Sequence, residues 1–284
     1  MNPLLRFAGL VARLLPAPLK QGLYKVKPLA ALLRRSLNTA APHGLTEVKV
    51  AAGALAGFTL TLDLQTEKDY WLGTYETNLQ LAARQFIQPA MVVYDVGANI
   101  GYISLLFASL CGKGGSVHSF EALPANINRF TRNITLNKMQ DRIHLNACAV
   151  VDSSRPVKFL THTSGAMGKV LGSAGREESY QNEIQVQGLA LDDYVFKKKN
   201  PPPQLIKMDI EGGEVLAIKG MQRILKEIHP LFFIELHGEQ SAAAVWQTLT
   251  SSKYVISTMQ ADFKPVSALD QLSWKAYIIA RPGN

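Results

Sequence analysis

Ionisable residues stand at the ends of several segments that otherwise have the composition of buried strands. A strand of a parallel sheet that is buried on both faces normally consists of consecutive apolar residues, so charged groups there need a function or a partner. Ligands of open α/β sheets bind at the carboxyl ends of the strands. We therefore interpret these residues as a candidate site, with a buried salt-bridge network around Lys207 as the alternative. They are Asp95, Glu121, Lys207, Asp209, Glu211, Glu235 and His237.

A glycine-rich turn follows the strand-like run 91–96 and precedes the apolar segment 102–111, which is long enough for a helix. Glu121 ends the next strand-like run, at the spacing at which nucleotide-binding folds have a ribose-binding acid. A dinucleotide motif would have glycines at positions 97, 99 and 102, whereas this chain has Asn99 and Tyr102 at the last two. The sequence therefore predicts a nucleoside ligand without a phosphate at this turn, and S-adenosylmethionine fits that description.

The predicted cofactor contacts come from this turn and from the strands on either side of it. The backbone of the turn and Asp95 would hold the amino-acid end of S-adenosylmethionine, and Glu121 would accept hydrogen bonds from both ribose hydroxyls. An ordinary strand-to-helix turn with a buried Asp as its cap is the alternative. The predicted contacts in this region are Asp95, Gly97, Ala98, Asn99, Gly101, Tyr102 and Glu121.

The elements that must position these residues alternate between strands and helices. This alternation predicts an α/β fold with a doubly wound, mostly parallel sheet of seven strands. A further strand pair is expected at 157–160 and 183–187, joined by the glycine-containing loop 164–180, which is either a substrate lid or a flexible hairpin tip. The strands of the main sheet are expected at 91–96, 116–120, 142–147, 204–210, 231–237, 254–257 and 274–280, with helices at 102–111, 127–136, 215–226 and 241–250.

The N-terminal part of the chain is expected to be an extension of this fold. Alternating apolar residues at 47–64 around a Gly53–Gly57 turn predict a β-hairpin, and helical periodicity at 75–86 predicts a helix that covers the cofactor site. We divide the chain into a basic, apolar extension (1–44), a hairpin with its cover helix (45–90) and a catalytic domain (91–284).

The net charge of +8 is concentrated at the N-terminus. Residues 1–40 contain seven basic residues and no acid, which leaves 23 basic and 22 acidic groups, or +1, for the rest of the chain. The body therefore has no general attraction for nucleic acid. Two short amphipathic helices are expected at 4–15 and 29–37. They either lie on an anionic membrane or pack on the body, and a third interpretation is that the segment is a targeting peptide.

Composition excludes two further classes of protein. Two cysteines, both inside apolar runs, exclude a disulfide scaffold and a cysteine-rich zinc site. No apolar run reaches the roughly 18 residues that span a bilayer. We expect a cytoplasmic protein, and peripheral attachment to a membrane is the alternative.

Four motifs together resemble the FkbM family of S-adenosylmethionine-dependent methyltransferases. They are Asp95-Val96-Gly97-Ala98-Asn99-Ile100-Gly101, Phe120-Glu121, Leu191-Asp192-Asp193-Tyr194 and the segment 206–214, Ile-Lys-Met-Asp-Ile-Glu-Gly-Gly-Glu. The resemblance extends from about residue 73 to 237, includes Tyr75-Glu76 and so adds Glu76 to the cofactor contacts. Where the family commonly has proline after Phe-Glu, this chain has Ala122.

The resemblance implies a class I, Rossmann-like methyltransferase fold and O-methylation of a sugar, glycolipid or polyketide-like acceptor. Its partner would be a small-molecule or glycan hydroxyl. The predicted catalytic set is Lys207, Asp209, Glu211, Glu235 and His237.

Two mechanisms are open for removing the acceptor proton. We favour His237 or Asp209 as general base, with Glu211 and Glu235 orienting it. The alternative is a divalent cation bound by Asp209, Glu211, Glu235 and His237. An NAD-dependent oxidoreductase and a non-catalytic, membrane-docked scaffold are the competing functions.

Overall fold

The computed structural model describes residues 3–14, 35, 37–162, 167–174, 180–273 and 275–283. The chain forms two compact units. Unit 1 contains Met1–Thr77 and Thr135–Asn137, and unit 2 contains Asn78–Ile134 and Lys138–Asn284. The division falls inside the segment 45–90, because its hairpin belongs to unit 1 and nearly all of its helix belongs to unit 2.

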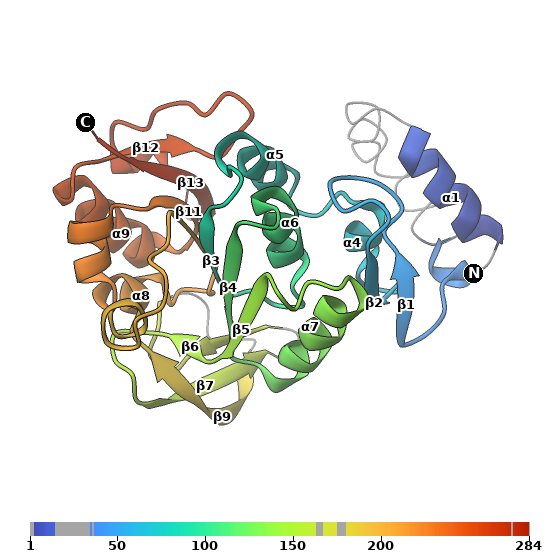
Figure 1. The fold of residues 1–284 in the computed structure, drawn as a ribbon, viewed down its shortest axis with the longest axis horizontal. Coiled ribbons are helices and arrows are strands. Elements are labelled where there is room, and N and C mark those ends of the chain that lie inside the picture. Colours follow the sequence, from blue (N-terminus) through green and yellow to red (C-terminus); the bar gives the residue numbers. More distant parts are fainter. Residues whose placement is uncertain are drawn as a thin grey trace. The chain divides into compact units, whose positions relative to one another are not determined.

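Unit 2 is built on a seven-stranded sheet (Figure 1). The order of the strands is β12-β13-β11-β10-β3-β4-β5, and only the two pairs that involve β13 are antiparallel. The predicted mostly parallel sheet of seven strands is therefore confirmed. The strands are β3 (Val92–Val96), β4 (Ser116–Glu121), β5 (Ile143–Ala147), β10 (Leu205–Met208), β11 (Leu231–His237), β12 (Tyr254–Thr258) and β13 (Lys275–Pro282).

Helices cover both faces of this sheet, as Figure 1 shows for α6 on one side and α9 on the other. Helix α6 contacts β3, β4 and β5, and α9 contacts β11 and β12. The expected helix at 75–86 is confirmed as α5. The helices are α5 (Thr77–Phe86), α6 (Tyr102–Cys111), α7 (Pro124–Leu136), α8 (Glu214–Lys219) and α9 (Glu239–Ser251).

The helix expected at 215–226 is wrong in its length. Helix α8 stops at Lys219, and a separate π-helical turn occupies Ile224–Ile228. A Cβ atom at Gly220 would lie 2.1 Å from the carbonyl oxygen of Val151. Glycine at this position therefore permits a close backbone approach that the helical periodicity did not reveal.

Alternation along the central strands sorts apolar and ionisable side chains onto different faces. Tyr94 and Val96 on β3, and Ile206 and Met208 on β10, belong to one hydrophobic core with residues of α8 and α9. The intervening residues, Asp95 among them, point to the other face, where Ser104 of α6 contacts Asp95. The period of the strands therefore determines which ionisable residues share a face.

A second sheet of unit 2 has the order β6-β9-β7-β8. The expected pair is confirmed as β7 (Pro156–His162) and β9 (Tyr180–Leu189), which are antiparallel. The joining loop 164–180 is not without structure, because β8 (Gly168–Val170) pairs with β7 and buries Val170. Residues 163–166 and 175–179 of this loop lie outside the part of the chain that the structure describes. Strand β6 is Ala149–Val150.

Unit 1 contains α1 (Pro3–Leu14), the antiparallel pair β1 (Leu45–Lys49) and β2 (Thr59–Asp63), and the short helix α4 (Lys68–Leu72). The predicted hairpin is confirmed. The Asn137 side chain accepts from the N–H of Thr59 (2.9 Å) and donates to its carbonyl (2.7 Å), which ties residues 135–137 to the hairpin. Most of the helix expected at 29–37 lies outside the described residues. No described helix is long and apolar enough to cross a membrane.

One buried histidine makes the stability of unit 2 depend on pH. Burial and the charge of His144 lower the pKa of His118 to about 4, and His118 Nδ1 lies 2.8 Å from the hydroxyl of Tyr194. The unfolded chain therefore takes up a proton on this residue at a higher pH than the folded chain. The free energy of unfolding should be highest above about pH 6.5 and should fall by roughly 3 kcal/mol down to about pH 4.

We expect His118→Gln to flatten this dependence. Urea unfolding at a series of pH values should give a smaller change between pH 6.5 and pH 4 for the variant than for the parent chain. His43→Gln is the matched control, because His43 is exposed. An unchanged slope in His118→Gln would show that other groups cause the acid sensitivity.

Candidate functional site

The turn after β3 depends on backbone conformations that favour glycine. Gly97, Asn99 and Gly101 have φ values of 78°, 50° and 86°. A Cβ atom at Gly97 would lie 1.9 Å from the carbonyl oxygen of Asp209, and one at Gly101 would lie 2.0 Å from the Phe130 ring. The two glycines therefore let the turn pack directly against the end of β10 and against α7.

Glu121 fixes the conformation of this turn. Its carboxylate accepts the backbone N–H of Asn99 and that of Leu123, both at 2.8 Å, and Asn126 Nδ2 lies 3.4 Å away. Burial raises the pKa of Glu121, and these hydrogen bonds oppose that effect. The backbone N–H of Ala122 also stabilises this carboxylate, so four donors face its roughly four acceptor sites.

Asp95 lies beneath the turn rather than at its surface. Its side chain is fully buried, its Oδ2 accepts the hydroxyl of Ser104 at 2.5 Å, and its Oδ1 lies 3.3 Å from Lys207 Nζ. Tyr102 and Ala98 are also buried, at 1% and 4% exposure. The carboxylate of Asp95 thus contacts Ser104 and Lys207 in this structure, and its contact with a cofactor stays a prediction.

Lys207 links the turn to the acids at the end of β10. Its ammonium group donates to the Gly97 carbonyl at 2.9 Å and lies 3.8 Å from Asp209 Oδ2. The buried ion-pair network considered as the alternative reading is present. The same contacts bring the predicted cofactor turn next to the predicted catalytic residues.

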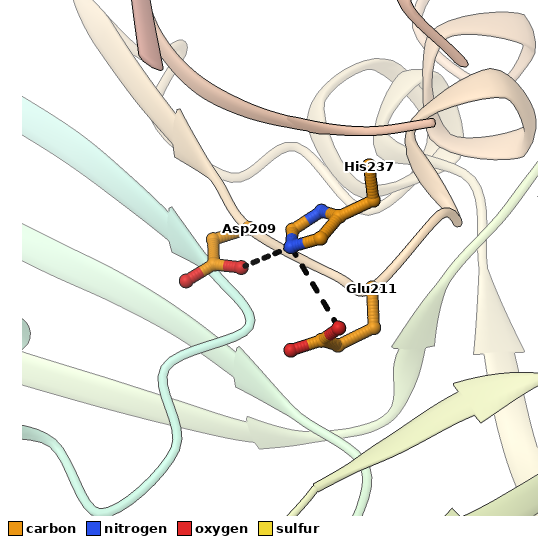
Figure 2. Close-up of side chains that lie close together, drawn as sticks. All are labelled: Asp209, Glu211 and His237. Carbon is orange, nitrogen blue, oxygen red and sulfur yellow. Dashed lines mark ion pairs between the residues drawn. The ribbon is translucent and has the colours of Figure 1, made fainter. Parts of the chain in front are cut away.

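The predicted catalytic acids gather around one imidazole. His237 Nε2 lies 3.4 Å from Glu235 Oε1, 3.7 Å from Glu211 Oε2 and 3.8 Å from Asp209 Oδ1. Figure 2 shows the ring of His237 with this nitrogen turned toward Asp209 and Glu211. Glu235 also forms an ion pair with Lys275 at 2.5 Å. The convergence expected at the carboxyl ends of β10 and β11 therefore occurs.

Glu214 is a residue of this cluster that the predicted catalytic set lacks. It is fully buried in the first turn of α8, and its carboxylate lies 3.1 Å from His237 Nδ1 and accepts the Ser241 hydroxyl at 2.7 Å. We expected Glu211 and Glu235 to orient the base, but the hydrogen bond that orients the ring comes from Glu214. Its position in the Glu-Gly-Gly-Glu motif was the available signal, whereas Ser241 had none.

The acids change the ionisation of their neighbours. Burial alone would lower the pKa of His237, but the nearby carboxylates of Glu214 and Glu235 raise it to about 10. Burial alone would raise the pKa of Glu235, but His237 and Lys275 lower it to about 2. Burial raises the pKa of Asp209 against the opposing charge of Lys207. Asp209, which remains 23% exposed, is therefore a better proton acceptor than a protonated His237.

The segment after β8 reaches the same cluster. The N–H of Ala174 donates to the carbonyl of Gly212 at 3.1 Å, next to Glu211. Burial and the charge of Glu211 raise the pKa of Tyr180, the first residue of β9, to about 12. Ala174 and Tyr180 thus both lie near Glu211. Glu76, with a φ of 49°, belongs to unit 1, and its cofactor contact stays a prediction.

Comparison with known proteins identifies relatives of this chain. The family described as "Methyltransferase FkbM domain" matches residues 95–256. The hexuronic acid methyltransferase AglP of Haloferax volcanii is 23% identical over 202 residues, which cover 70% of this chain and 79% of that protein. The 31-O-demethyl-FK506 methyltransferase FkbM of Streptomyces tacrolimicus is 25% identical over 177 residues, which cover 50% of this chain and 67% of that protein.

A solved structure is similar as well. The methyltransferase FkbM of Methylobacillus flagellatus has a TM-score of 0.45 and 18% sequence identity. The likeness covers 76% of this chain and 54% of that one, so this chain spans about half of that structure's length.

Proposed function

This chain belongs to the FkbM methyltransferase family and is an S-adenosylmethionine-dependent methyltransferase with the class I fold, and we propose that it methylates a hydroxyl group. The acceptor that we propose is a sugar, a glycolipid or a polyketide-like molecule. The observation that carries the proposal is the pair of contacts made by Lys207. One ammonium group touches both the glycine turn and the acid cluster, so a methyl donor at the turn would have the acids beside it. The family assignment replaces the NAD-dependent alternative.

The turn fits a nucleoside that has no phosphate there. Gly97 and Asn99 keep exposed surface, while the missing Cβ of Gly97 leaves room for the close approach to Asp209. Glu121, fixed by two backbone N–H groups of the turn, is the acid to which we assign the ribose hydroxyls. Asp95 acts on the turn through Lys207 and is a positioning residue. S-adenosylmethionine supplies the methyl group as an electrophilic sulfonium.

The acid cluster would position and deprotonate the acceptor. Alignment of the reacting atoms at about 3 Å supplies much of the rate of such a displacement. Asp209 has exposed surface and a raised pKa, so we assign it the hydroxyl proton. Glu214 holds the His237 ring, and Lys207 holds Asp209 relative to the turn.

We propose that acceptor choice depends in part on the described residues Ala174 and Tyr180, which lie near Glu211. The two named relatives act on a hexuronic acid and on demethyl-FK506, so we propose an acceptor with several oxygen atoms.

Labelled methyl transfer tests this function. The chain is incubated with methyl-labelled S-adenosylmethionine and with fractions of glycans, glycolipids and polyketides, and the labelled product is identified by mass spectrometry. We expect a methyl ether that survives mild base. A base-labile methyl ester would move the reaction to a carboxyl group, and a product methylated on nitrogen or carbon would contradict the proposal.

We also propose that α1 binds an anionic membrane. Leu5 and Ala12 are buried within unit 1, whereas Phe7, Leu10 and Leu14 are 64%, 53% and 71% exposed. These three positions share one face of the helix, opposite the packed face. One face of the helix thus packs within unit 1, and the other face is apolar and exposed. The segment 1–40, to which the helix belongs, has seven basic residues and no acid. Each basic group near an anionic surface contributes on the order of 1 kcal/mol.

Substitution of the exposed face tests this attachment without disturbing the packed face. The parent chain should co-sediment with vesicles that contain phosphatidylglycerol and should be released by high salt. The variant Phe7→Ser, Leu10→Ser, Leu14→Ser should remain in the supernatant with an unchanged melting temperature. Leu81→Ser is the control, because Leu81 is 50% exposed but lies on α5. Absence of vesicle binding by the parent would exclude the membrane contact.

A further inference from the structure

We propose that Asp209, Glu211 and His237 form a binding site for a divalent cation. The inference deepens the proposed function, since the site lies at the acid cluster to which we assign the acceptor hydroxyl. One ligand atom from each residue lies within 4.8 Å of the others. The sequence predicts a general base here with a cation as the alternative, and the geometry around the imidazole supports a cation site at these residues.

The first observation is a buried nitrogen without a hydrogen bond. His237 is 6% exposed, and its Nε2 has no hydrogen-bond partner among the described residues. Three carboxylate oxygens surround it at 3.4 to 3.8 Å. A charge-assisted hydrogen bond would be about 2.7–2.9 Å long, so the carboxylates are too far away to accept a proton from Nε2 in this arrangement.

The same distances suit a shared cation. Divalent metals bind imidazole nitrogen and carboxylate oxygen at about 2.0–2.2 Å, which leaves the ligand atoms roughly 3–4 Å from each other. His237 Nε2 lies 3.7 Å from Glu211 Oε2 and 3.8 Å from Asp209 Oδ1. Figure 2 shows both carboxylates on the side of the ring to which Nε2 points.

The second observation is the partner of the other ring nitrogen. Histidine ligands of metals commonly donate their remaining N–H to a carboxylate, which fixes the ring and its tautomer. Glu214 Oε1 lies 3.1 Å from His237 Nδ1, and Glu214 is itself fixed by Ser241 at 2.7 Å. With Nδ1–H donated to Glu214, a cation would replace the proton on Nε2 and would bind the lone pair that points toward Asp209 and Glu211.

Charge supports the same assignment. Five carboxylates, Asp95, Asp209, Glu211, Glu214 and Glu235, face the two ammonium groups of Lys207 and Lys275. With a neutral imidazole this set has an excess of about three negative charges, of which one divalent cation would neutralise two.

The ligand set also indicates the kind of cation. Two carboxylates and one imidazole suit Mn²⁺, Fe²⁺ or Zn²⁺ better than Ca²⁺, which prefers oxygen ligands throughout. Asp209 and Glu211 are 23% and 33% exposed, so further coordination positions are open toward solvent. Three protein ligands with open positions are typical of catalytic rather than structural metal sites. A cation here would supply Lewis acidity beside the acceptor hydroxyl.

Binding of Mn²⁺ alone tests the site. The full chain is dialysed against EDTA, freed of chelator and titrated with MnCl₂, and free Mn²⁺ is followed by electron paramagnetic resonance and heat by calorimetry. We expect one bound Mn²⁺ per chain, with displacement by Zn²⁺. His237→Gln should abolish binding, and Glu211→Gln should weaken it at least tenfold. Glu239→Gln, an exposed acid at the start of α9, should bind as the parent does.

Two variants keep the test independent of folding. His237→Gln removes the partner of the buried Glu214 and can lower the melting temperature, whereas Glu211 is partly exposed and its replacement leaves that pair intact. No Mn²⁺ or Zn²⁺ binding by the parent, or binding that Glu211→Gln leaves unchanged, would overturn the proposal.

The outcome is separable from that of the proposed function. Cation binding with this variant pattern, but without methyl transfer to any hydroxyl, would keep the site and reject O-methylation. Methyl transfer to a hydroxyl by a chain that binds neither metal would reject the site and keep the function.

Discussion

Glu121→Ala should weaken the binding of S-adenosylhomocysteine by about 2–4 kcal/mol, or roughly 30- to 1,000-fold. The substitution has two physical effects. It removes the charged acceptor to which we assign the ribose, and it leaves the N–H groups of Asn99 and Leu123 without their 2.8 Å acceptor. Titration calorimetry with S-adenosylhomocysteine measures the affinity.

Two further variants separate these effects. Glu121→Gln keeps an acceptor oxygen for one of the two backbone N–H groups, so we expect an affinity between those of the parent and of Glu121→Ala. Glu183→Ala is the control, because Glu183 is an exposed acid paired with Lys158 on β7. Equal affinity in the parent and in Glu121→Ala would show that the ribose binds elsewhere. Absence of cofactor binding in the parent would instead support the scaffold alternative.

Asp209→Asn should lower the turnover number by about 10²- to 10⁴-fold, the range attributed to a positioned proton acceptor. If Asp209 is instead a cation ligand, the turnover number should also fall, because a neutral amide binds a cation less strongly than a carboxylate does. The backbone carbonyl of Asp209, which lies beside Gly97, is unchanged by the substitution. Cofactor affinity should therefore stay within a few-fold of the parent value, the pattern of a group that acts in the transition state.

The measurement uses the acceptor fraction that the parent chain labels. Single-turnover transfer gives the chemical step, and calorimetry gives the cofactor affinity of the same preparation. Asp262→Asn is the control, because Asp262 forms an exposed ion pair with Lys264. Undiminished transfer by Asp209→Asn would mean that the reaction does not take place at the acid cluster. Sensitivity of the parent to EDTA, with recovery on addition of Mn²⁺, then separates a cation ligand from a general base.

Some elements of the fold could be predicted because their signals are local. The run before Asp95 and the glycine turn after it specify strand, turn and helix whatever surrounds them. The same local alternation gave the hairpin of unit 1 and the strand pair β7 and β9. Helix α8 was predicted too long, because its end depends on contact between Gly220 and Val151, which are distant in sequence.

Most residues of the candidate site could also be predicted from the sequence. A parallel sheet brings the carboxyl ends of neighbouring strands to one edge, so Lys207, Asp209, Glu235 and His237 had to approach each other once β10 and β11 were recognised as neighbours. The alternation of side chains along a strand further separated Lys207 from its apolar neighbours.

Only the tertiary structure decided which groups each of these residues contacts. Asp95 has the type and position of a cofactor contact, but packing of α6 buries it against Ser104 and Lys207. Glu214 is an ordinary first-turn acid in the sequence, and the docking of α8 beside β11 makes it the partner of His237. His237 Nε2 either donates a hydrogen bond to a carboxylate or faces space for a cation. Which of the two occurs depends on changes of about 1 Å in the distances from Nε2 to the carboxylate oxygens, which come from separate elements. Sequence periodicity determines faces and edges, whereas those distances follow from how the helices pack on the sheet.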